Sequence, residues 1–382
     1  MLITQPSELE QFSAKHRVWQ GMPGIVRTKG GRVFVSFYSG NVTEDYGNYA
    51  VVIKSDDGKN FGEPVVAAKK DGQFRCFDCA IWIDPLDRLW FFWSVMPGEE
   101  TYASICENPD AETLCFGEEF YVGRGVMLNK PTVLSSGEWL FPIAFWRPDH
   151  CADLYKQMRL PGLKPDDVPG SFVYKTSDNG KTFEKMGGIE IPEVSFYEHQ
   201  VVELQDGTLM MLIRTLYGIG VSYSYDRGKT WSEGKDSGLG GPSSRFFICR
   251  LRSGRILLIN HYHFTERNNL TALLSEDDGK TFPYSLLLDE RSLVSYPDAH
   301  EGDDGYIYIT YDRERGSFTS SLEEAYSQAR EILTARITED DIISGVLHDG
   351  SYIKNIATKL GKLADEDVEI LRPKYCKKQS IV

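Results

Sequence analysis

Short apolar runs recur along the chain, and each run follows a polar turn. The runs are rich in β-branched, aliphatic and aromatic residues, which favours strands over helices. The six turns with their strands are Gly30–Val35, Leu86–Phe91, Ser136–Leu140, Asp206–Met210, Ser253–Leu257 and Asp304–Tyr308. Marked at residues 31, 87, 137, 207, 254 and 305, the turns lie 56, 50, 70, 47 and 51 residues apart. About fifty residues is the length of a four-stranded propeller blade, so the pattern predicts an all-β chain folded as a six-bladed β-propeller.

A second repeat, eight residues long, occurs four times between these turns. The copies are Lys54–Phe61, Thr176–Phe183, Ser224–Trp231 and Ser275–Phe282. Every copy has Asp at its third position, Gly at its fifth and an aromatic residue at its eighth. An Asp side chain can bond the backbone N–H groups that follow it, and Gly can adopt a positive φ. We therefore expect the four aspartates to fix turns on the outer rim rather than to take part in catalysis: Asp56, Asp178, Asp226 and Asp277.

The C-terminal part of the chain departs from the blade pattern. We expect one propeller domain over residues 1–345 and an extension over 346–382 that packs on it. Residues 332–337 predict a last strand, able to close the ring against the N-terminal segment. Residues 339–347 and 352–360 predict short helices outside the ring. The longest interval between turns contains a polar insertion at 148–169, expected to be a loop on the rim of the top face.

Composition narrows the partners and the compartment. A net charge of −14 and a pI near 5.1 disfavour nucleic acid and anionic membranes as partners. The first ten residues lack a basic segment and an apolar core, and no run of about 18 apolar residues follows, so we expect neither signal peptide nor membrane span, and a cytoplasmic protein. Cys76 and Cys79 form a lone CxxC, read as two buried reduced thiols, and no metal or organic cofactor is expected.

The eight-residue phrase resembles the Asp-box, or BNR repeat, of the sialidase superfamily. Between the boxes the resemblance to exo-sialidases becomes more specific. That family places a Glu before a strand that ends in Arg, a second Arg one blade later ahead of an Asp-box, and a Tyr before the next turn. Four residues match these positions in order and approximate spacing: Glu198, Arg214, Arg267 and Tyr296. The resemblance covers roughly residues 16 to 340.

The resemblance implies a retaining glycosidase in which Tyr296 is the nucleophile. A neutral phenol avoids the repulsion that a carboxylate attacker would meet at an anomeric carbon bearing its own carboxylate. Because a phenol has a pKa near ~10, it needs an adjacent base, and Glu198 would serve. Arg214 and Arg267 would grip the substrate carboxylate through paired guanidinium hydrogen bonds.

The family also uses an acid on a loop of the first blade to protonate the leaving oxygen. Asp45 occupies that loop, with Glu44 as the second choice. Asp78, where the second blade begins, could also face the pocket. His199 neighbours Glu198 and is a further candidate for contact with the substrate or for orienting Glu198.

One position departs from the family pattern. Sialidases carry an Arg-Ile-Pro phrase on the first strand, whose Arg completes a three-arginine clamp, but here Gly21 stands in its place. Either Arg75 or Arg245 supplies the third guanidinium, or the substrate presents its acid differently or not at all. The charged run at residues 312–315 is expected to be a salt-bridged surface.

The sequence thus predicts a glycoside hydrolase resembling exo-sialidases, which releases a terminal acidic sugar such as sialic acid. Two alternatives remain open. One is a carbohydrate-binding propeller without catalysis, favoured by Gly21, and the other is a hydrolase or lyase acting on a glycan that contains uronic acid. The expected partner is a glycan or a small acidic sugar, and the sequence leaves the oligomeric state open.

Overall fold

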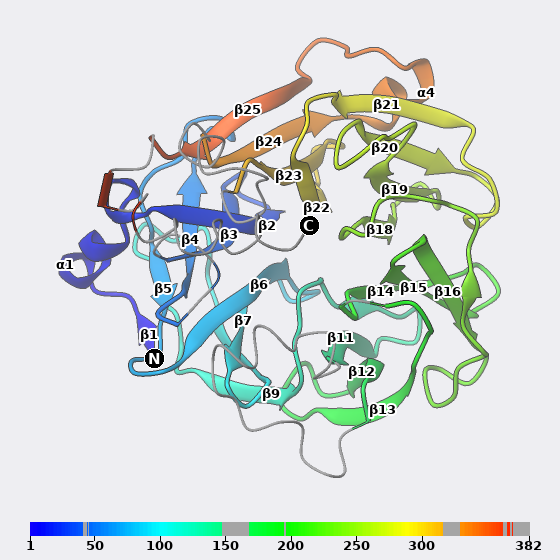
Figure 1. Cartoon of the computed structure of the whole chain (residues 1–382), viewed down its shortest axis with the longest axis horizontal. Coiled ribbons are helices and arrows are strands. Elements are labelled where there is room, and N and C mark those ends of the chain that lie inside the picture. Colours follow the sequence, from blue (N-terminus) through cyan, green and yellow to red (C-terminus); the bar gives the residue numbers. More distant parts are fainter. Residues whose placement is uncertain are drawn as a thin grey trace.

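The protein is a six-bladed β-propeller, as the turn repeat predicts. The computed structural model describes residues 1–40, 44, 46–146, 168–194, 196–315, 329–361, 365–366 and 369. Six antiparallel sheets follow one another around a central axis in chain order (Figure 1). Each of the six marked turns joins the first strand of a blade, which lies nearest the axis, to the second strand.

Every blade is a four-stranded meander, and the first blade gains a short fifth strand at its outer edge. The strands of blades one to three are β1 (Leu2–Ile3), β2 (Trp19–Arg27), β3 (Val33–Gly40), β4 (Tyr49–Ser55), β5 (Val66–Ala68), β6 (Arg75–Ile83), β7 (Leu89–Met96), β8 (Glu100–Cys106), β9 (Phe120–Arg124), β10 (Thr132–Val133), β11 (Trp139–Phe145), β12 (Gly170–Thr176) and β13 (Glu184–Ile189). The strands of blades four to six are β14 (His199–Glu203), β15 (Leu209–Thr215), β16 (Gly218–Ser224), β17 (Lys235–Asp236), β18 (Phe247–Arg250), β19 (Ile256–His261), β20 (Leu270–Ser275), β21 (Tyr284–Asp289), β22 (Val294–Glu301), β23 (Ile307–Arg313), β24 (Glu331–Ile337) and β25 (Tyr352–Lys359).

The second strands of the blades form the hydrophobic core between neighbouring sheets. All eight residues of β7 are buried, and β3 and β11 are buried along their whole length. A strand covered on both faces needs no polar alternation, which explains the continuous apolar runs in the sequence. Between blades two and three the packing is largely aromatic, with Trp82 and Trp90 set against Trp139 and Phe141.

The four Asp-boxes join the third and fourth strands of blades one, three, four and five. Their glycines all have positive φ, between 75° and 86°. In the second box Asp178 accepts hydrogen bonds from the backbone N–H groups of Lys181 and Thr182, which confirms its turn-fixing role. The first box differs, because Asp57 rather than Asp56 bonds the backbone of Lys59 and Asn60. Asp56 instead pairs with the side chains of Arg32 and Lys54.

The sixth blade corrects the prediction for the C-terminal part. The strand predicted at residues 332–337 is β24, which pairs with β23 and β25 within blade six and also lies against β2 of the first blade. Residues 352–359 are not a helix: they form β25, the outer strand of blade six. The propeller therefore continues past the boundary expected at residue 345. The polar insertion at 148–169 falls almost wholly outside the described residues.

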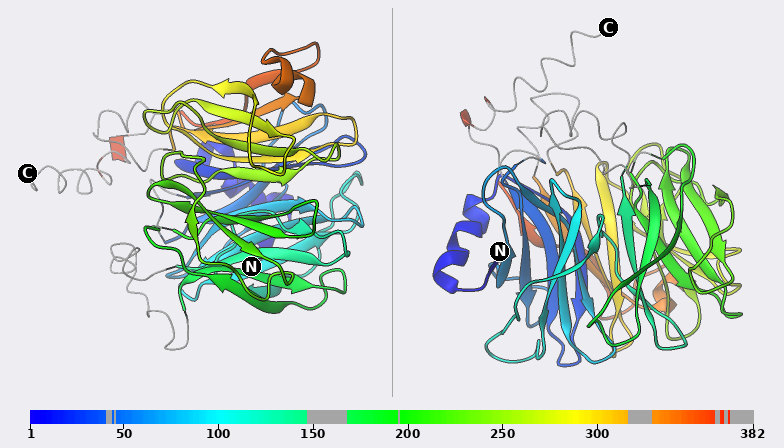
Figure 2. Two further views of the ribbon diagram at one scale, coloured as in Figure 1. Left: turned by 90° about the vertical axis from the view of Figure 1, so that its right-hand side faces the viewer. Right: turned by 90° about the horizontal axis from the view of Figure 1, so that it is seen from below.

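The helical segments lie at the margin of the ring. The helix α1 (Pro6–Leu9) lies beside blade one (Figures 1 and 2). The helix α4 (Glu339–Ser344), which confirms one predicted helix, replaces an Asp-box in blade six and packs on β20 and β21. Its capping Thr338 accepts the N–H of Asp341, whose side chain accepts the N–H of Thr338. Within the described part of the chain, no helix is long and apolar enough to cross a bilayer.

Candidate active site

Three of the residues singled out in the sequence meet near the axis. The Tyr296 hydroxyl donates a hydrogen bond to Glu198 Oε1 at 2.8 Å. Arg214 Nη1 lies 2.9 Å from the same carboxylate oxygen and 3.0 Å from the Tyr296 hydroxyl oxygen. Blade six supplies the tyrosine, and blade four supplies Glu198 just before β14 and Arg214 near the end of β15. Glu198 and Arg214 come 98 and 82 positions before Tyr296 in the sequence. Their carboxylate and guanidinium nevertheless form one hydrogen-bonded triad with the phenol.

The triad is buried, and its electrostatics follow from that burial. The residues Tyr296, Glu198 and Arg214 are 4%, 6% and 6% exposed. Burial, together with the charge of Glu198, raises the pKa of Tyr296 to about 12, so the phenol is neutral at pH 7. Within the described part of the chain, Glu198 Oε2 has no hydrogen-bond partner. The site therefore holds a protonated phenol against a carboxylate with one oxygen still available to accept a proton or a ligand hydroxyl.

Two more guanidinium groups lie against the Tyr296 ring. The Arg267 Cζ atom is 5.6 Å from the ring centroid and the Arg315 Cζ atom is 4.4 Å from it. Ser243 joins two of the arginines, since its carbonyl accepts from Arg267 and its hydroxyl accepts from Arg214. Burial lowers the pKa of Arg267 to about 10, which leaves it cationic at pH 7. Three cations thus surround one carboxylate and one neutral phenol, an arrangement suited to an anionic ligand.

Arg315 is the residue that sequence reasoning missed. The charged run at 312–315 was expected on a salt-bridged surface, but the Arg315 and Asp312 side chains are 5% and 0% exposed. The pairing of β22 with β23 places Val294 opposite Arg313, so residues just after β23 return to the Tyr296 end of the blade. That hairpin register was the available signal, because it follows from the turn at residue 305.

A shared backbone device shapes the inner strands of blades six, one and two. Each of β22, β2 and β6 has an irregularity in its pairing at the same point, near its start. The residue inside each irregularity has a positive φ: 56° at Tyr296, 57° at Met22 and 42° at Asp78. Such a conformation costs a non-glycine residue about 1–3 kcal/mol. Blade packing therefore holds Asp78 and Tyr296 in equivalent positions.

Blades one and two contribute a second polar group, made of Asp78, Arg75, Tyr38 and Glu44. Burial, with the charge of Glu198, raises the pKa of Asp78 to about 8, so its carboxyl group is largely protonated at pH 7. Arg75 packs its guanidinium 4.3 Å from the Phe77 ring and donates to the Tyr38 hydroxyl. Glu44 accepts from the same hydroxyl. Asp45, the expected acid, lies outside the described residues.

Two other candidates point elsewhere. Arg245 donates to Asn129 Oδ1 at 2.7 Å and to the Pro23 carbonyl at 3.2 Å, and it pairs with Asp298 at 3.4 Å. These contacts link blades one, three, five and six near the centre of the ring, and together they form the floor of the candidate site. The His199 ring bonds the Phe172 carbonyl in blade three at 2.7 Å, and burial lowers its pKa to about 4.

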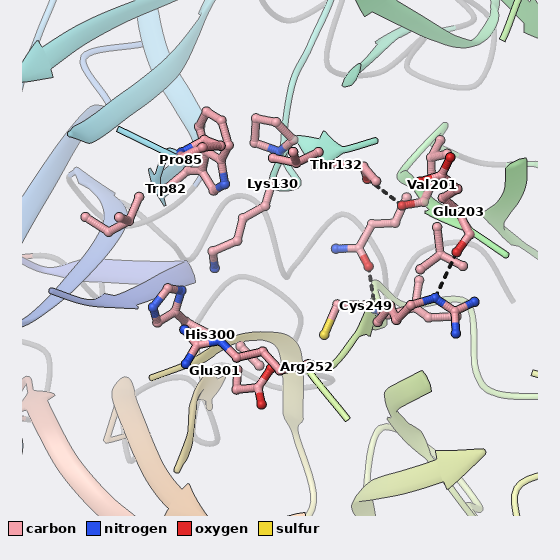
Figure 3. A pocket seen from close by; sticks show the side chains of 18 of the residues that line it. Trp82, Pro85, Lys130, Thr132, Val201, Glu203, Cys249, Arg252, His300 and Glu301 are labelled. Carbon is pink, nitrogen blue, oxygen red and sulfur yellow. Dashed lines mark hydrogen bonds between the residues drawn. The ribbon is translucent and has the colours of Figure 1, made fainter. Parts of the chain in front are cut away.

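The opposite end of the central channel contains a cavity of about 810 Å³. The turns between first and second strands line it, together with Lys130, His300 and Glu301 (Figure 3). Tyr296 and Glu301 stand near opposite ends of β22, so this cavity lies away from the triad. Lys130 bonds Asp298, which also accepts the backbone N–H of Ile25. The Lys130–Asp298–Arg245 contacts thus separate the cavity from the site.

The CxxC pair is buried. The exposed fraction of Cys76 and of Cys79 is 0%, and burial raises the pKa of each thiol to about 12. Neither sulfur belongs to a disulfide. Both side chains pack in the apolar core between the first blades.

The blades, the Asp-boxes and the buried Tyr–Glu pair define the class: a six-bladed propeller of the sialidase superfamily, as the repeats predict. The family model of the BNR repeat-like domain matches residues 81–309, and the chain belongs to that family. Curated protein sequences gave no match.

Several solved structures with the same fold are sialidases or trans-sialidases of low identity. The Hadza microbial sialidase Hz136 is 20% identical with a TM-score of 0.62, covering 78% of this chain and 64% of its own. The NanB sialidase from Streptococcus pneumoniae is 15% identical with a TM-score of 0.60, covering 86% of this chain and 70% of its own. The intramolecular trans-sialidase from Ruminococcus gnavus is 14% identical with a TM-score of 0.62, covering 87% of this chain and 97% of its own. Identities this low show a common fold, and the chain spans less than two thirds of Hz136.

Proposed function

We propose that the protein is a retaining glycoside hydrolase that releases a terminal acidic sugar, sialic acid or a relative of it. The observation that carries the proposal is the 2.8 Å hydrogen bond from the buried Tyr296 hydroxyl to Glu198. Glycosidases of this superfamily are the ones that use tyrosine as nucleophile. The surrounding arginines support an acidic substrate.

In the proposed reaction the Tyr296 oxygen attacks the anomeric carbon while Glu198 takes the phenolic proton. The bond to the leaving oxygen breaks, and an acid protonates that oxygen. Asp45 is our proposed acid, on the strength of its place in the first-blade loop. Water then displaces the tyrosine from the anomeric carbon, with the proton returning from Glu198 to the phenol and Asp45 acting as base.

The raised pKa of Tyr296 is consistent with a tyrosine nucleophile that depends on Glu198 as its base. A phenol with a pKa of about 12 is unreactive until a base removes its proton. Glu198 accepts the phenolic hydrogen bond already, so proton transfer needs no rearrangement. Arg214 contacts both partners and can stabilise the phenolate as it forms.

The test is a panel of fluorogenic glycosides that contains an α-sialoside, a β-glucuronide, an α-galacturonide and a neutral galactoside. We expect turnover of at least one acidic member and none of the neutral one. Tyr296→Phe should lower kcat by at least about 10²-fold, the scale of removing a catalytic group. Tyr311→Phe is the matched control, because Tyr311 is also buried and also donates to a carboxylate, that of Asp289.

Three results would refute the proposal. Absence of turnover across the panel, with acidic sugars still bound, would favour the carbohydrate-binding alternative. Equal activity of wild type and Tyr296→Phe would exclude tyrosine as nucleophile. An unsaturated sugar among the products would instead indicate the lyase alternative.

A further inference from the structure

The residue at position 21 has no side chain because another residue occupies the space. A Cβ atom built on Gly21 would lie 2.3 Å from Arg315 Cδ, 2.8 Å from Arg315 Cγ and 3.1 Å from Asp312 Oδ2. Gly21 has no positive φ, so its backbone conformation is open to any residue. Close approach of the Arg315 stem is therefore the reason for glycine here.

The carboxylate of Asp312 holds Arg315 in this place, and it also accepts hydrogen bonds from the irregular parts of β2 and β22. Asp312 Oδ2 accepts the backbone N–H of Met22 at 2.7 Å and lies 3.7 Å from Arg315 Nε. Asp312 Oδ1 accepts the Ser295 hydroxyl at 2.8 Å. The guanidinium of Arg315 is thereby aimed along the face of the Tyr296 ring. An arginine restrained this way loses little further entropy on binding an anion.

We propose that Arg315 is the third guanidinium of a carboxylate site that it forms with Arg214 and Arg267. In this arrangement Arg315, from blade six, supplies the cation that the first strand lacks at position 21. Glycine at position 21 and arginine at position 315 thus compensate for each other. The ligand is the planar carboxylate of an acidic sugar, so this inference rests on the proposed function. Arg315, rather than Arg75 or Arg245, is then the source of the third cation.

The alternatives fit less well. Arg245 already has hydrogen bonds to Asn129 and to the Pro23 carbonyl within the floor. Arg75 stacks on Phe77 and bonds Tyr38. By contrast, Arg214, Arg267 and Arg315 all have charge interactions with the single phenol of Tyr296.

Binding of free sugars tests the inference without requiring catalysis. The probes are N-acetylneuraminic, glucuronic and galacturonic acids and the methyl ester of each, titrated by calorimetry at pH 7. We expect the wild type to prefer at least one acid over its ester. Arg315→Ala should weaken that acid at least tenfold and leave the ester within twofold, while Arg315→Lys should give an intermediate loss. Arg313→Ala, which removes a neighbouring cation paired with Glu331, is the control and should behave as wild type.

Position 21 provides an independent test. Gly21→Ala should weaken acid binding as Arg315→Ala does, because its Cβ would displace the Arg315 stem. The double variant Gly21→Arg with Arg315→Gly should recover part of the affinity by restoring a guanidinium from β2. Thermal melting confirms that each variant is folded, and Arg315→Lys, which keeps charge and stem, covers the case in which Arg315→Ala does not fold.

The inference is overturned if folded Arg315 variants bind the acids as the wild type does, if acid and ester weaken together, or if the wild type prefers no acid over its ester. Its failure differs from failure of the proposed function. An active enzyme whose KM for an acidic glycoside is unchanged in Arg315→Lys would refute this inference alone. Selective acid binding without any turnover would refute hydrolysis and leave the inference standing.

Discussion

Among the triads of a tyrosine, a carboxylate and an arginine in the described part of the chain, two buried ones differ in how many oxygens of the carboxylate are hydrogen-bonded. Between blades five and six, Tyr311 donates to Asp289, and Arg291 donates to both oxygens of the same carboxylate. Near the axis, Tyr296 and Arg214 both contact Glu198 Oε1, while Oε2 has no partner within the described residues. Residue types alone therefore do not separate a structural triad from a candidate catalytic one.

The pKa of the tyrosine does not separate them either. Burial raises the pKa of Tyr311 well above its ordinary value and also raises the pKa of Tyr296. What differs is the second oxygen of the carboxylate and the two additional cations, Arg267 and Arg315, against the Tyr296 ring. A saturated carboxylate stabilises the fold, whereas one with a free oxygen beside excess cations can receive a ligand.

The largest expected effect comes from neutralising the two carboxylates. Glu198→Gln should lower kcat by about 10²–10⁴-fold, because an amide cannot take the phenolic proton. Asp289→Asn should leave kcat of the folded enzyme unchanged and lower the free energy of unfolding by about 2 kcal/mol, since one of its hydrogen-bonded oxygens becomes a donor. Steady-state rates on the preferred glycoside and urea unfolding measure the two effects. If Glu198→Gln lowers the free energy of unfolding and leaves kcat unchanged, Glu198 is a structural carboxylate like Asp289, and the contrast between the two triads is wrong.

The next effect is a pH dependence of stability whose sign should differ between the two regions. The folded-state pKa of Asp78, about 8, lies far above the value near ~3.9 of an unfolded chain. The folded state therefore binds more protons than the unfolded state between about pH 4 and pH 8, and stability falls as pH rises through that window. Asp78→Asn removes this loss, so its stability relative to wild type should rise by up to about 5 kcal/mol from pH 4 to pH 8.

Asp289 supplies the control with the opposite sign. Hydrogen bonds from Arg291 outweigh burial and hold the pKa of Asp289 below its ordinary value. Its stabilising contribution is present above the unfolded pKa and is lost as pH falls through the folded pKa. Urea unfolding of Asp78→Asn and Asp289→Asn from pH 3 to pH 8 measures both. A flat difference between Asp78→Asn and wild type across pH 4–8 would contradict the assignment of Asp78 as a neutral carboxyl group.

The two regions also explain which parts of the protein were readable in the sequence. Turn glycines and box aspartates recur because similar tight turns connect the strands of successive blades, so the six blades and the outer turns could be predicted. The irregularities of the inner strands instead have positive φ at Met22, Asp78 and Tyr296, which are three unlike residues. No periodic pattern reveals such a device, and Tyr296 was found through the family resemblance instead.

Arg315 and β25 mark the limits of that reading. Arg315 looked like part of a surface charge run because residues 312–315 were read by themselves, without the β22–β23 register that brings them back to Gly21. Residues 352–359 read as a helix because their pattern is short and half exposed, and only pairing with β24 makes them a strand. In both places, contacts between segments outweigh local preference.

A smaller effect is expected from removing each tyrosine hydroxyl. Tyr311→Phe should lower the free energy of unfolding by about 1 kcal/mol, the usual net value of a buried hydrogen bond. Tyr296→Phe should change it by less than about half of that, because Glu198 keeps the contact with Arg214 and already tolerates one unbonded oxygen. Chemical unfolding at pH 7 compares the two variants directly. Equal losses would mean that both triads serve the fold alike.

The smallest expected effect concerns the arginine of the structural triad. Arg291 donates through Nε and Nη2 to Asp289, whose side chain is 0% exposed. Arg291→Lys keeps the charge but loses the two-pronged geometry, so the free energy of unfolding should fall by about 0.5–1 kcal/mol. Arg255 is the matched control: its side chain is 32% exposed against 31% for Arg291, and it also directs Nε and Nη2 at a carboxylate, but its partner Glu276 is 48% exposed. Arg255→Lys should cost less than about 0.5 kcal/mol, because water screens that pair. If the two variants lose the same stability, burial of the carboxylate is not what gives the Tyr311 triad its structural role, and the contrast with Glu198 must rest on the cations around Tyr296 alone.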